Sequence, residues 1–207
     1  PRVVLASSIA VYDARAGFKV TEQTPLEPDP ARREPYVAAK LAQEVALCQS
    51  RLSCWRLRRG ALYDSRRRWN AHIGLAFGPV LISLARRGAL PLLHVQDAAA
   101  AVLRAAETAP SSHCEALNLI ESAPPMRAEF IRAWGAGLHV PLHWRLLLPF
   151  AHLAEALLGA RAPGLLRPQV LHARMAAHDY PNMRAMARLG WLPAHRFVRP
   201  PAQRSVP

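Results

Sequence analysis

The chain has 207 residues, of which 51% are apolar, and a formal net charge of +13 at pH 7. This length is enough for one substantial domain with a hydrophobic core, and the moderate content of charged residues excludes an intrinsically disordered chain. The positive charge does not by itself predict nucleic-acid binding, because the arginines are scattered, with one tight run at 66–68, and aromatic residues are not interleaved with them. We therefore expect no nucleic-acid partner.

The cysteines favour a reducing compartment. Cys48, Cys54 and Cys114 are odd in number and lack a Cys-x-x-Cys pair, which favours buried thiols over a disulfide framework or a zinc site. No signal peptide is in view, and strand-like sequence directly follows Pro1, so the sequence resembles a processed or partial chain. The longest apolar run, 146–160, is interrupted and too short to span a bilayer. We expect a cytoplasmic protein without a transmembrane segment.

The first half of the chain alternates strand-like and helix-like segments. Residues 2–8 (RVVLASS) lack polar alternation and predict a strand buried on both faces, as in parallel sheets. After the polar, Pro-rich loop 13–33, Glu34 and Pro35 open a helix. One apolar stripe at helical spacing is expected to pack on a sheet: Val37, Leu41, Val45 and Cys48.

Further strands are predicted at 54–63, 90–95 and 115–120, with helices at 77–87 and 97–109. This alternation predicts an α/β fold with a parallel sheet. After residue 122 only helices are predicted, at 126–137, 145–159, 167–177 and 181–191. We interpret them as a small, mainly helical lobe carried by the sheet domain.

A tyrosine and a lysine stand four residues apart in the helix that opens at Pro35. Of the 27 lysines and arginines only Lys19 and Lys40 are lysines, and Lys40 follows Tyr36 by one helical turn, so both side chains project from one face. An ammonium beside a phenol favours the phenolate and lowers its pKa from ~10. Such a tyrosine can pass a proton to or from a substrate oxygen. The motif is short and also occurs by chance, as a surface tyrosine packed on a lysine stem.

Two serines end the first predicted strand. Ser7 and Ser8 lie at its carboxyl end, where open α/β sheets bind their ligands. A hydroxyl there can hydrogen-bond the same substrate oxygen that Tyr36 protonates. Ser8, Tyr36 and Lys40 are therefore the candidate catalytic residues.

Several segments, in order, resemble one known family. "SSIAVY" at 7–12 is similar to its Ser-Ser-x-x-Val-Tyr segment, "PYVAAK" at 35–40 to its Pro-Tyr-x-x-x-Lys helix, and "LRRGALYD" at 57–64 to its Leu-Arg-Pro-Gly-x-Val-Tyr-Gly strand. "HVQDAAAAV" at 94–102, "EALNLI" at 115–120 and "NMRAMARLGWLP" at 182–193 resemble its later segments. The chain is thus similar to the extended short-chain dehydrogenase/reductases, or NAD-dependent epimerase/dehydratases, over most of residues 2–193.

The resemblance implies a fold and two domains. The fold is α/β, a partial Rossmann-like parallel sheet with a small, mainly helical substrate lobe. Residues 1–122 would be the C-terminal part of an NAD(P)-binding domain with substrate-lobe insertions, and residues 123–207 the helical substrate-binding lobe and tail. Family members often pair through the helix that bears the tyrosine and lysine, so the resemblance also implies a homodimer.

The resemblance assigns roles to the site residues. Tyr36 would be the catalytic acid/base, Lys40 would bind the nicotinamide ribose and lower the pKa of Tyr36, and Ser8 would hold the reacting oxygen. The nicotinamide side of the site would be lined by Gly60, Ala61 and Leu62. The implied support for the substrate lobe comes from Asp97 and Asn118.

The chain also departs from the family pattern. Arg59 replaces the usual proline and Asp64 the usual glycine. None of the ten glycines forms the Gly-x-x-Gly-x-x-Gly turn that holds the cofactor pyrophosphate. We expect that about a hundred residues of a typical domain of this kind are missing before Pro1, and that the given chain binds NAD weakly or not at all.

The leading hypothesis is an NAD(P)-dependent epimerase/dehydratase or reductase that transfers a hydride at a carbinol or ketone carbon. Its substrate would be a nucleotide sugar or, if Trp134, Trp144 and 146–148 shape an apolar pocket, an apolar ketone or alcohol. The alternative is a non-catalytic or decayed relative that acts as a binding protein. The choice between NAD and NADP stays open, because the residue that reads the ribose would precede Pro1.

Two further patterns carry weaker signals. Arg66, Arg67 and Arg68 are interpreted as a solvated loop, with a grip on a nucleotide diphosphate as the alternative. His139 and His143 stand four apart, but Pro141 lies between them and no acidic or cysteine partner is nearby. We therefore predict no metal site.

Overall fold

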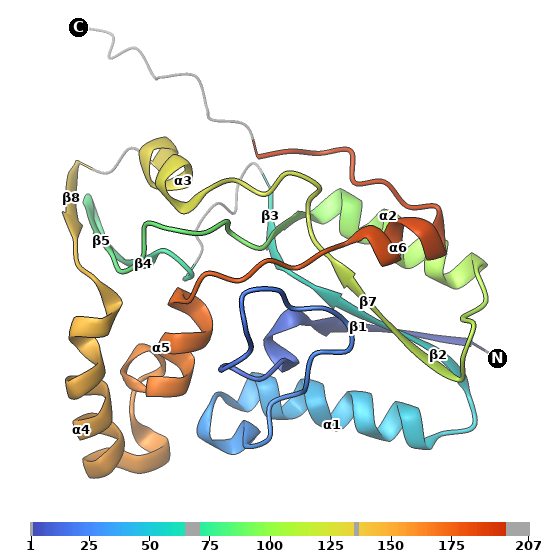
Figure 1. Cartoon of the computed structure of the whole chain (residues 1–207), viewed down its shortest axis with the longest axis horizontal. Helices are drawn as coiled ribbons and strands as arrows, with labels where there is room; N and C mark the ends of the chain where they lie inside the picture. The colour runs from blue at the N-terminus through green and yellow to red at the C-terminus, as the bar shows by residue number, and fades with distance from the viewer. Residues whose placement is uncertain (1, 65–70, 135–136, 198–207) are drawn as a thin grey trace, which may run out of the picture.

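A three-stranded parallel sheet lies at the centre of the computed structural model, which describes residues 2–64, 71–134 and 137–197 (Figure 1). The strand order is β1 (Arg2–Ser8), β2 (Ser53–Arg59) and β7 (Cys114–Leu119). The register pairs Ser8 with Arg59 and Arg59 with Leu119, so the three strands end together. The α/β fold with a partial parallel sheet is confirmed.

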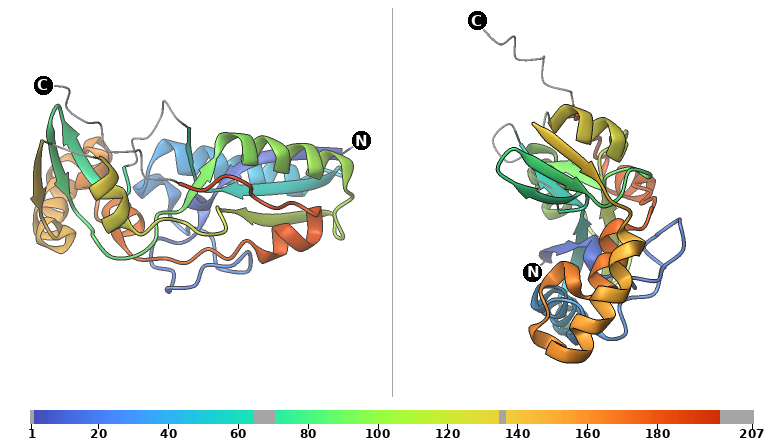
Figure 2. Two further views of the ribbon diagram at one scale, coloured as in Figure 1. Left: turned by 90° about the horizontal axis from the view of Figure 1, so that it is seen from above. Right: turned by 90° about the vertical axis from the view of Figure 1, so that its left-hand side faces the viewer.

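Helices cover both faces of this sheet (Figures 1 and 2). Helix α1 (Pro35–Gln49) lies on one face, whereas α2 (Val95–Glu107) and α6 (Met183–Leu189) lie on the other. The alanines of α2 let that helix approach the sheet closely. The core on the α2 side consists of Trp55, Leu57, Leu93, Ala98, Ala101, Ala105, Leu117, Leu119, Ala185, Leu189 and Trp191. Burial of this apolar surface is the main favourable term for the sheet domain.

Strand β2 presents different chemistry to its two faces, because successive side chains of a strand point to opposite sides. Trp55 and Leu57 join the core beneath α2. Arg56 and Arg58 point to the other side and bond to Glu44 of α1. The face of the sheet under α1 is therefore polar, unlike the face under α2.

A lobe at the end of the molecule away from the N terminus completes the fold (Figures 1 and 2). Its hairpin, β4 (Gly74–Phe77) and β5 (Val80–Ser83), is antiparallel, and β8 (Leu138–Pro141) pairs parallel with β5. Helices α4 (Leu148–Leu158) and α5 (Pro168–Met175) share a core with this sheet. The core residues are Leu84, Ala85, Trp144, Ala151, Leu171 and Met175.

The remaining elements link the lobe to the central sheet. Strands β3 (Ala61–Tyr63) and β6 (Leu92–His94) form a parallel pair, and helix α3 (Arg127–Trp134) packs Phe130 and Ile131 against them. Short 3-10 turns occur at η1 (Ile9–Val11), η2 (Pro30–Arg32), η3 (Trp144–Leu147), η4 (Gly159–Arg161) and η5 (Gly164–Leu166).

Three predicted elements are corrected by the structure. The helix predicted at 77–87 is instead the β4–β5 hairpin, because Gly78 adopts a positive φ of 54° and turns the chain before Pro79. The strand predicted at 54–63 is divided between β2 and β3 at Gly60. The segment after residue 122 is not helical alone, since β8 lies within it.

The predicted burial of two elements is also corrected. Strand β1 lies at the edge of the described sheet, paired with β2 on one side only, and the segment from Arg2 to Ala6 is not buried. In α1, Val45 is 51% exposed and Glu44 takes its place on the buried face. The buried positions of α1 are thus 37, 41 and 44, with the half-buried Cys48 one further turn along the same face. Within the described ranges, no helix is long and apolar enough to cross a membrane.

Candidate active site

A pocket of about 210 Å³ opens where strands β1 and β2 end. Ser8, Tyr36, Gly60 and Ala61 are among its lining residues, together with Arg59. Four residues that the sequence singled out for catalysis or cofactor binding therefore face one space. The position agrees with the general placement of ligands at the carboxyl ends of parallel strands.

Ser8 is held at the last position of β1. Its side chain is buried, and its Oγ accepts a hydrogen bond from the backbone N–H of Ala10 at 3.2 Å, which caps the 3-10 turn η1. Because the strand ends in this turn, the hydroxyl is fixed at the rim of the sheet. The hydroxyl hydrogen is not used in this bond.

Tyr36 and Lys40 occupy the first two turns of α1. Tyr36 is 45% exposed and lines the pocket. The Nζ of Lys40 lies 5.9 Å from the centroid of the Tyr36 ring and donates to the backbone oxygen of Ala6 at 2.8 Å and to Oε1 of Gln43 at 3.2 Å. Lys40 therefore connects the helix that bears Tyr36 to the strand that bears Ser8.

The three predicted cofactor-side residues do not all point the same way. Gly60 and Ala61 line the pocket, whereas Leu62 packs against the core under α2. Gly60 is required for close packing, because a Cβ there would lie 2.3 Å from the backbone oxygen of Pro91 and 2.6 Å from Cδ1 of Ile120.

A buried ionic network lies behind the site, on the α1 face of the sheet. Ser7 donates to Oε1 of Glu44 at 2.5 Å, and Arg58 donates to the same carboxylate through Nε at 3.0 Å and Nη2 at 2.7 Å. Arg56 adds a bond of 3.2 Å. Burial opposes ionisation of Glu44, but the bonds from Arg58 and Ser7 outweigh it and lower the pKa of this carboxyl.

Several pocket residues were not predicted from the sequence. Glu34, before α1, forms a 2.6 Å ion pair with Arg174 of α5. His72 stands in the wall, where desolvation and the positive charges of Arg127 and Arg174 lower its pKa to about 3, so the ring is neutral at physiological pH. His178 and Tyr180 follow α5. His72, Arg174, His178 and Tyr180 come from segments distant in sequence from Tyr36, and no local motif marks them.

The two residues expected to support the lobe hold chain segments in place. The carboxylate of Asp97 accepts the backbone N–H groups of Ala194 and His195 at 3.1 and 3.0 Å, which fixes the segment after α6. Asn118 accepts the Tyr12 hydroxyl at 2.6 Å and donates to the oxygen of Val20 at 3.1 Å. Asn118 therefore fixes the loop between β1 and α1.

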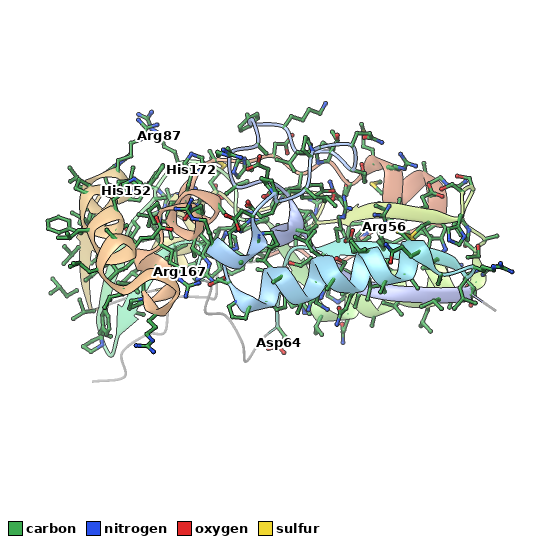
Figure 3. The ribbon with its side chains drawn as sticks, turned by 90° about the horizontal axis from the view of Figure 1, so that it is seen from below. Arg56, Asp64, Arg87, His152, Arg167 and His172 are labelled. Carbon is green, nitrogen blue, oxygen red and sulfur yellow. A yellow bond between two sulfur atoms is a disulfide. The ribbon has the colours of Figure 1, made fainter. Side chains whose placement is uncertain are left out.

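A second, larger hollow of about 750 Å³ lies in the lobe, on the other side of α5. Two of its lining residues, Arg87 and His172, lie at the same end of the molecule as His152 of α4 (Figure 3). The hollow is lined by residues of the β5–β6 connection, the β8–α4 connection and α5, with several cationic or titratable side chains: Arg86, Arg87, His143, Arg145 and His172. Residues 173, 174 and 178 face the first pocket and residues 172 and 175–177 face the second, so α5 and the residues after it form a shared wall.

Other sequence candidates lie elsewhere. Arg66, Arg67 and Arg68 fall outside the described residues. His139 hydrogen-bonds Ser83 at 2.8 Å, and His143 caps η3 by accepting from the N–H of Arg145. Neither histidine belongs to a group of potential metal ligands in the part of the chain that the structure describes.

The chain matches no protein-family model and no curated protein. Solved structures resemble it at low sequence identity. MoeE5 in complex with UDP-glucuronic acid and NAD superposes with a TM-score of 0.62 at 17% identity, over 94% of this chain and 60% of that chain. A UDP-glucose-4-epimerase from Stenotrophomonas maltophila, with bound NAD and formylated UDP-arabinopyranose, gives 0.61 at 18% identity, over 94% and 59%. The structure of gox2253 gives 0.65 at 20% identity, over 93% and 61%.

The chain thus spans about 60% of the length of these structures. The order of motifs along the chain and the superposition of nearly all of it on these structures agree. The chain therefore shares the fold of these structures, one of which is a UDP-glucose-4-epimerase with bound NAD.

Proposed function

We propose that this chain carries the catalytic and substrate-binding part of an NAD(P)-dependent epimerase/dehydratase or related reductase. The reaction is hydride transfer at a carbinol or ketone carbon, with Tyr36 moving the proton. The observation that supports it best is the shared pocket of Ser8 and Tyr36, with Lys40 held beside the Tyr36 ring by a bond to the strand of Ser8.

Each side chain has a distinct role in this proposal. The Tyr36 hydroxyl donates a proton to the substrate oxygen, or accepts one from it, at the rim of the sheet. Ser8 donates its remaining hydroxyl hydrogen to the same oxygen and fixes the substrate relative to Tyr36. Lys40 contributes a compact positive charge next to the phenol, which the planar guanidinium of an arginine would not supply in the same geometry.

The donors present fit one end of the cofactor. Lys40, Tyr36 and the small residues Gly60 and Ala61 are suited to the nicotinamide ribose, and the nicotinamide supplies the hydride chemistry when it is bound. The 207 residues contain no glycine-rich turn for the pyrophosphate. The proposal therefore assigns this chain the nicotinamide end of the cofactor site only.

The proposed substrate is a nucleotide sugar. The sugar would lie against Ser8 and Tyr36, and its anionic diphosphate against Arg59 and Arg174, which line the same pocket. The cationic lining favours this substrate class over an apolar ketone or alcohol. Two of the similar structures hold UDP-sugars.

A Tyr36→Phe variant of the full-length protein tests the assignment. Loss of the hydroxyl is expected to lower kcat at least about 100-fold with UDP-glucose and NAD, while NADH affinity changes little. Tyr63→Phe is the matched control, because that buried tyrosine lies outside the pocket and its variant should retain turnover. Unchanged kcat in Tyr36→Phe would remove Tyr36 from the reaction.

The second candidate is a binding protein without catalysis. The absent glycine-rich turn favours it, as do the bonds of the Lys40 ammonium to Ala6 and Gln43. Calorimetric titration with NADH and with UDP-glucose separates the two functions. Binding of the nucleotide sugar alone, with no NADH binding and no turnover by the full-length protein, would support the second candidate.

The proposal includes a homodimer through the outer face of α1. Val45 is 51% exposed on that face, next to alanines at 42 and 46 that allow close helix approach. Analytical ultracentrifugation should give twice the mass of one chain, and the Val45→Glu substitution should shift the equilibrium toward the monomer. A monomer at all concentrations would contradict the dimer.

A further inference from the structure

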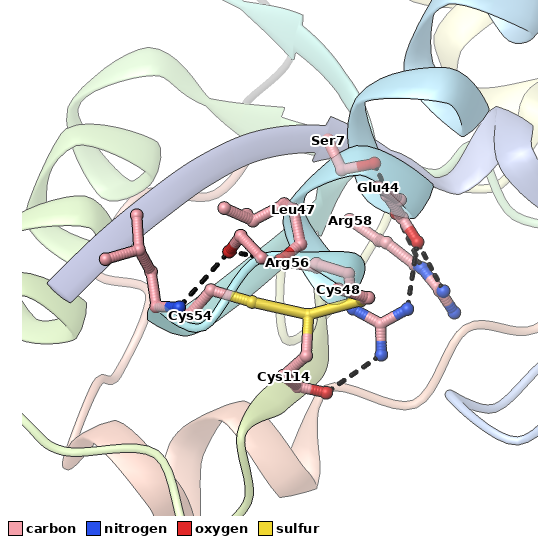
Figure 4. The surroundings of a disulfide bond; sticks show 10 residues. Ser7, Glu44, Leu47, Cys48, Cys54, Arg56, Arg58 and Cys114 are labelled. Carbon is pink, nitrogen blue, oxygen red and sulfur yellow. Dashed lines mark hydrogen bonds and ion pairs between the residues drawn. A yellow bond between two sulfur atoms is a disulfide. The ribbon is translucent and has the colours of Figure 1, made fainter.

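The three cysteines of the chain converge at the opposite end of the sheet from the pocket (Figure 4). Cys48 lies in the last turn of α1, Cys54 near the start of β2 and Cys114 at the start of β7. Ser8 pairs with Arg59 of β2, and Cys54 lies five residues before Arg59. The cluster is therefore about 16 Å along the strand from the Ser8 end of the sheet. This distance separates the cluster from the proposed active site.

The sulfur atoms are within reach of one another. All three Sγ atoms lie within 4.8 Å of each other, and the sulfur of Cys114 contacts both of the others. Cys54 is fully buried, whereas Cys48 and Cys114 are half-buried, so an ion from solution can reach the group. The pairing of Cys54 with Cys114 across β2 and β7 fixes two of the sulfurs side by side.

A disulfide can join only two of the three cysteine sulfurs. Because a divalent sulfur forms a single S–S bond, Cys114 can join either Cys48 or Cys54, and the remaining thiol is left over. A metal ion, in contrast, is bound by all three thiolates at once. Sulfur ligands select thiophilic ions such as Cu(I) and Zn²⁺.

The surroundings carry the positive charge that thiolates need. Arg56 donates to the backbone oxygen of Cys114 at 3.0 Å, and its Nε is buried without a hydrogen-bond partner among the described residues. Arg56 and Arg58 both pair with the carboxylate of Glu44, which holds the Arg56 guanidinium beside the cluster. A nearby guanidinium lowers the cost of ionising the thiols.

We propose that Cys48, Cys54 and Cys114 form a three-thiolate site for a thiophilic metal ion. A bound metal ion would link the end of α1 to strands β2 and β7, because each of these three elements supplies one cysteine. Within the described residues no histidine or carboxylate completes the group, so the site offers three protein ligands and leaves further coordination to solvent. The sequence lacks a Cys-x-x-Cys pair, so its spacing predicts no metal site, but the topology brings the three cysteines together.

Metal titration of the reduced, metal-free chain tests this site. Zn²⁺ and, under anaerobic conditions, Cu(I) are the probes, with native mass spectrometry to count bound ions. One ion per chain is expected, together with protection of all three thiols from alkylation in the folded protein. Denaturation with a chelator should then release three alkylatable thiols.

Single variants separate this site from adventitious binding. Cys48→Ser changes a half-buried residue and should weaken binding at least tenfold without loss of fold by circular dichroism, and Cys114→Ser should do the same. His152→Ala, exposed on α4 and remote from the cluster, is the control and should bind as the unaltered chain does. Equal binding by the cysteine variants would overturn the proposal, as would failure of the fully reduced chain to retain an ion.

Discussion

Arg58 of β2 and Glu44 of α1 form a buried ion pair, with Nη2 2.7 Å from Oε2. Their side chains are 3% and 2% exposed, and Ser7 of β1 bonds to the same carboxylate. The pair fixes the helix that carries Tyr36 and Lys40 to the sheet. Such a pair adds little net stability over an apolar pair, but removal of one partner leaves an uncompensated buried charge.

We therefore expect Glu44→Ala to destabilise the fold by roughly 3–5 kcal/mol, measured by urea unfolding. Glu107→Ala is the matched control, because the Glu107 side chain is 69% exposed and its ion pair with Arg104 is long, at 3.9 Å. The free energy of unfolding of this variant should change by no more than about 0.5 kcal/mol. A Glu44→Ala protein as stable as the control would contradict the structural role of the pair.

Acid should weaken the fold through Glu115. Burial disfavours its charge, but bonds from the Ser111 backbone, Arg188 and Arg184 lower the pKa of this carboxyl to about 2. Because the folded pKa is below the ordinary value of 4.5, the stabilisation is complete above that value and is lost as pH falls toward 2. The stability difference between the unaltered chain and Glu115→Gln should therefore shrink across this window. A pH-independent difference would show that the charge of Glu115 is not involved.

The proposed diphosphate site predicts a split between KM and kcat. Arg59→Ser and Arg174→Ser are both expected to raise KM for UDP-glucose about tenfold, with kcat nearly unchanged, because each arginine lies in the pocket beside a part of the substrate that does not react. The effect should diminish at high salt. Arg104→Ser, on the exposed side of α2, should leave KM unaltered. An equal KM in all three variants would place the diphosphate elsewhere.

Gly60→Ala should disturb both stability and the pocket. An added methyl group would press on the backbone of Pro91, which cannot move without shifting β6, so we expect a loss of about 1–3 kcal/mol in thermal unfolding. Gly17→Ala is the control, since nothing lies within 4 Å of a Cβ there. Equal melting temperatures for the two variants would contradict this packing.

The strands of the central sheet and the helix of Tyr36 and Lys40 could be predicted because their signals are local. Strand β1 is a short run rich in β-branched and apolar residues, and Pro35 marks the start of α1. The motif order then indicated the fold, which the solved structures confirm. Ser8, Tyr36, Gly60 and Ala61 face one pocket for the same reason, since each follows directly from where an element begins or ends.

The errors and omissions come from contacts between distant segments. Glu44 is buried because Arg56 and Arg58 lie opposite it, a pairing that alternation in "CWRLRR" hints at but cannot place on α1. The apolar run of the β4–β5 hairpin is short and fits both the helical and the strand period, so its sequence predicts a helix that the structure does not contain. Convergence of the cysteines depends on the register of β2 with β7, which spacing does not encode.

The position of β1 at the edge of the described sheet has a practical consequence for handling the protein. Its outer row of N–H and C=O groups can accept another strand, and of its seven residues only Arg2 carries a charge that would discourage this. Copies of the chain produced alone should therefore associate through their β1 edge strands and precipitate as the protein concentration rises. A charged substitution at an exposed position of that strand, such as Ala6→Lys, should improve recovery of dispersed protein.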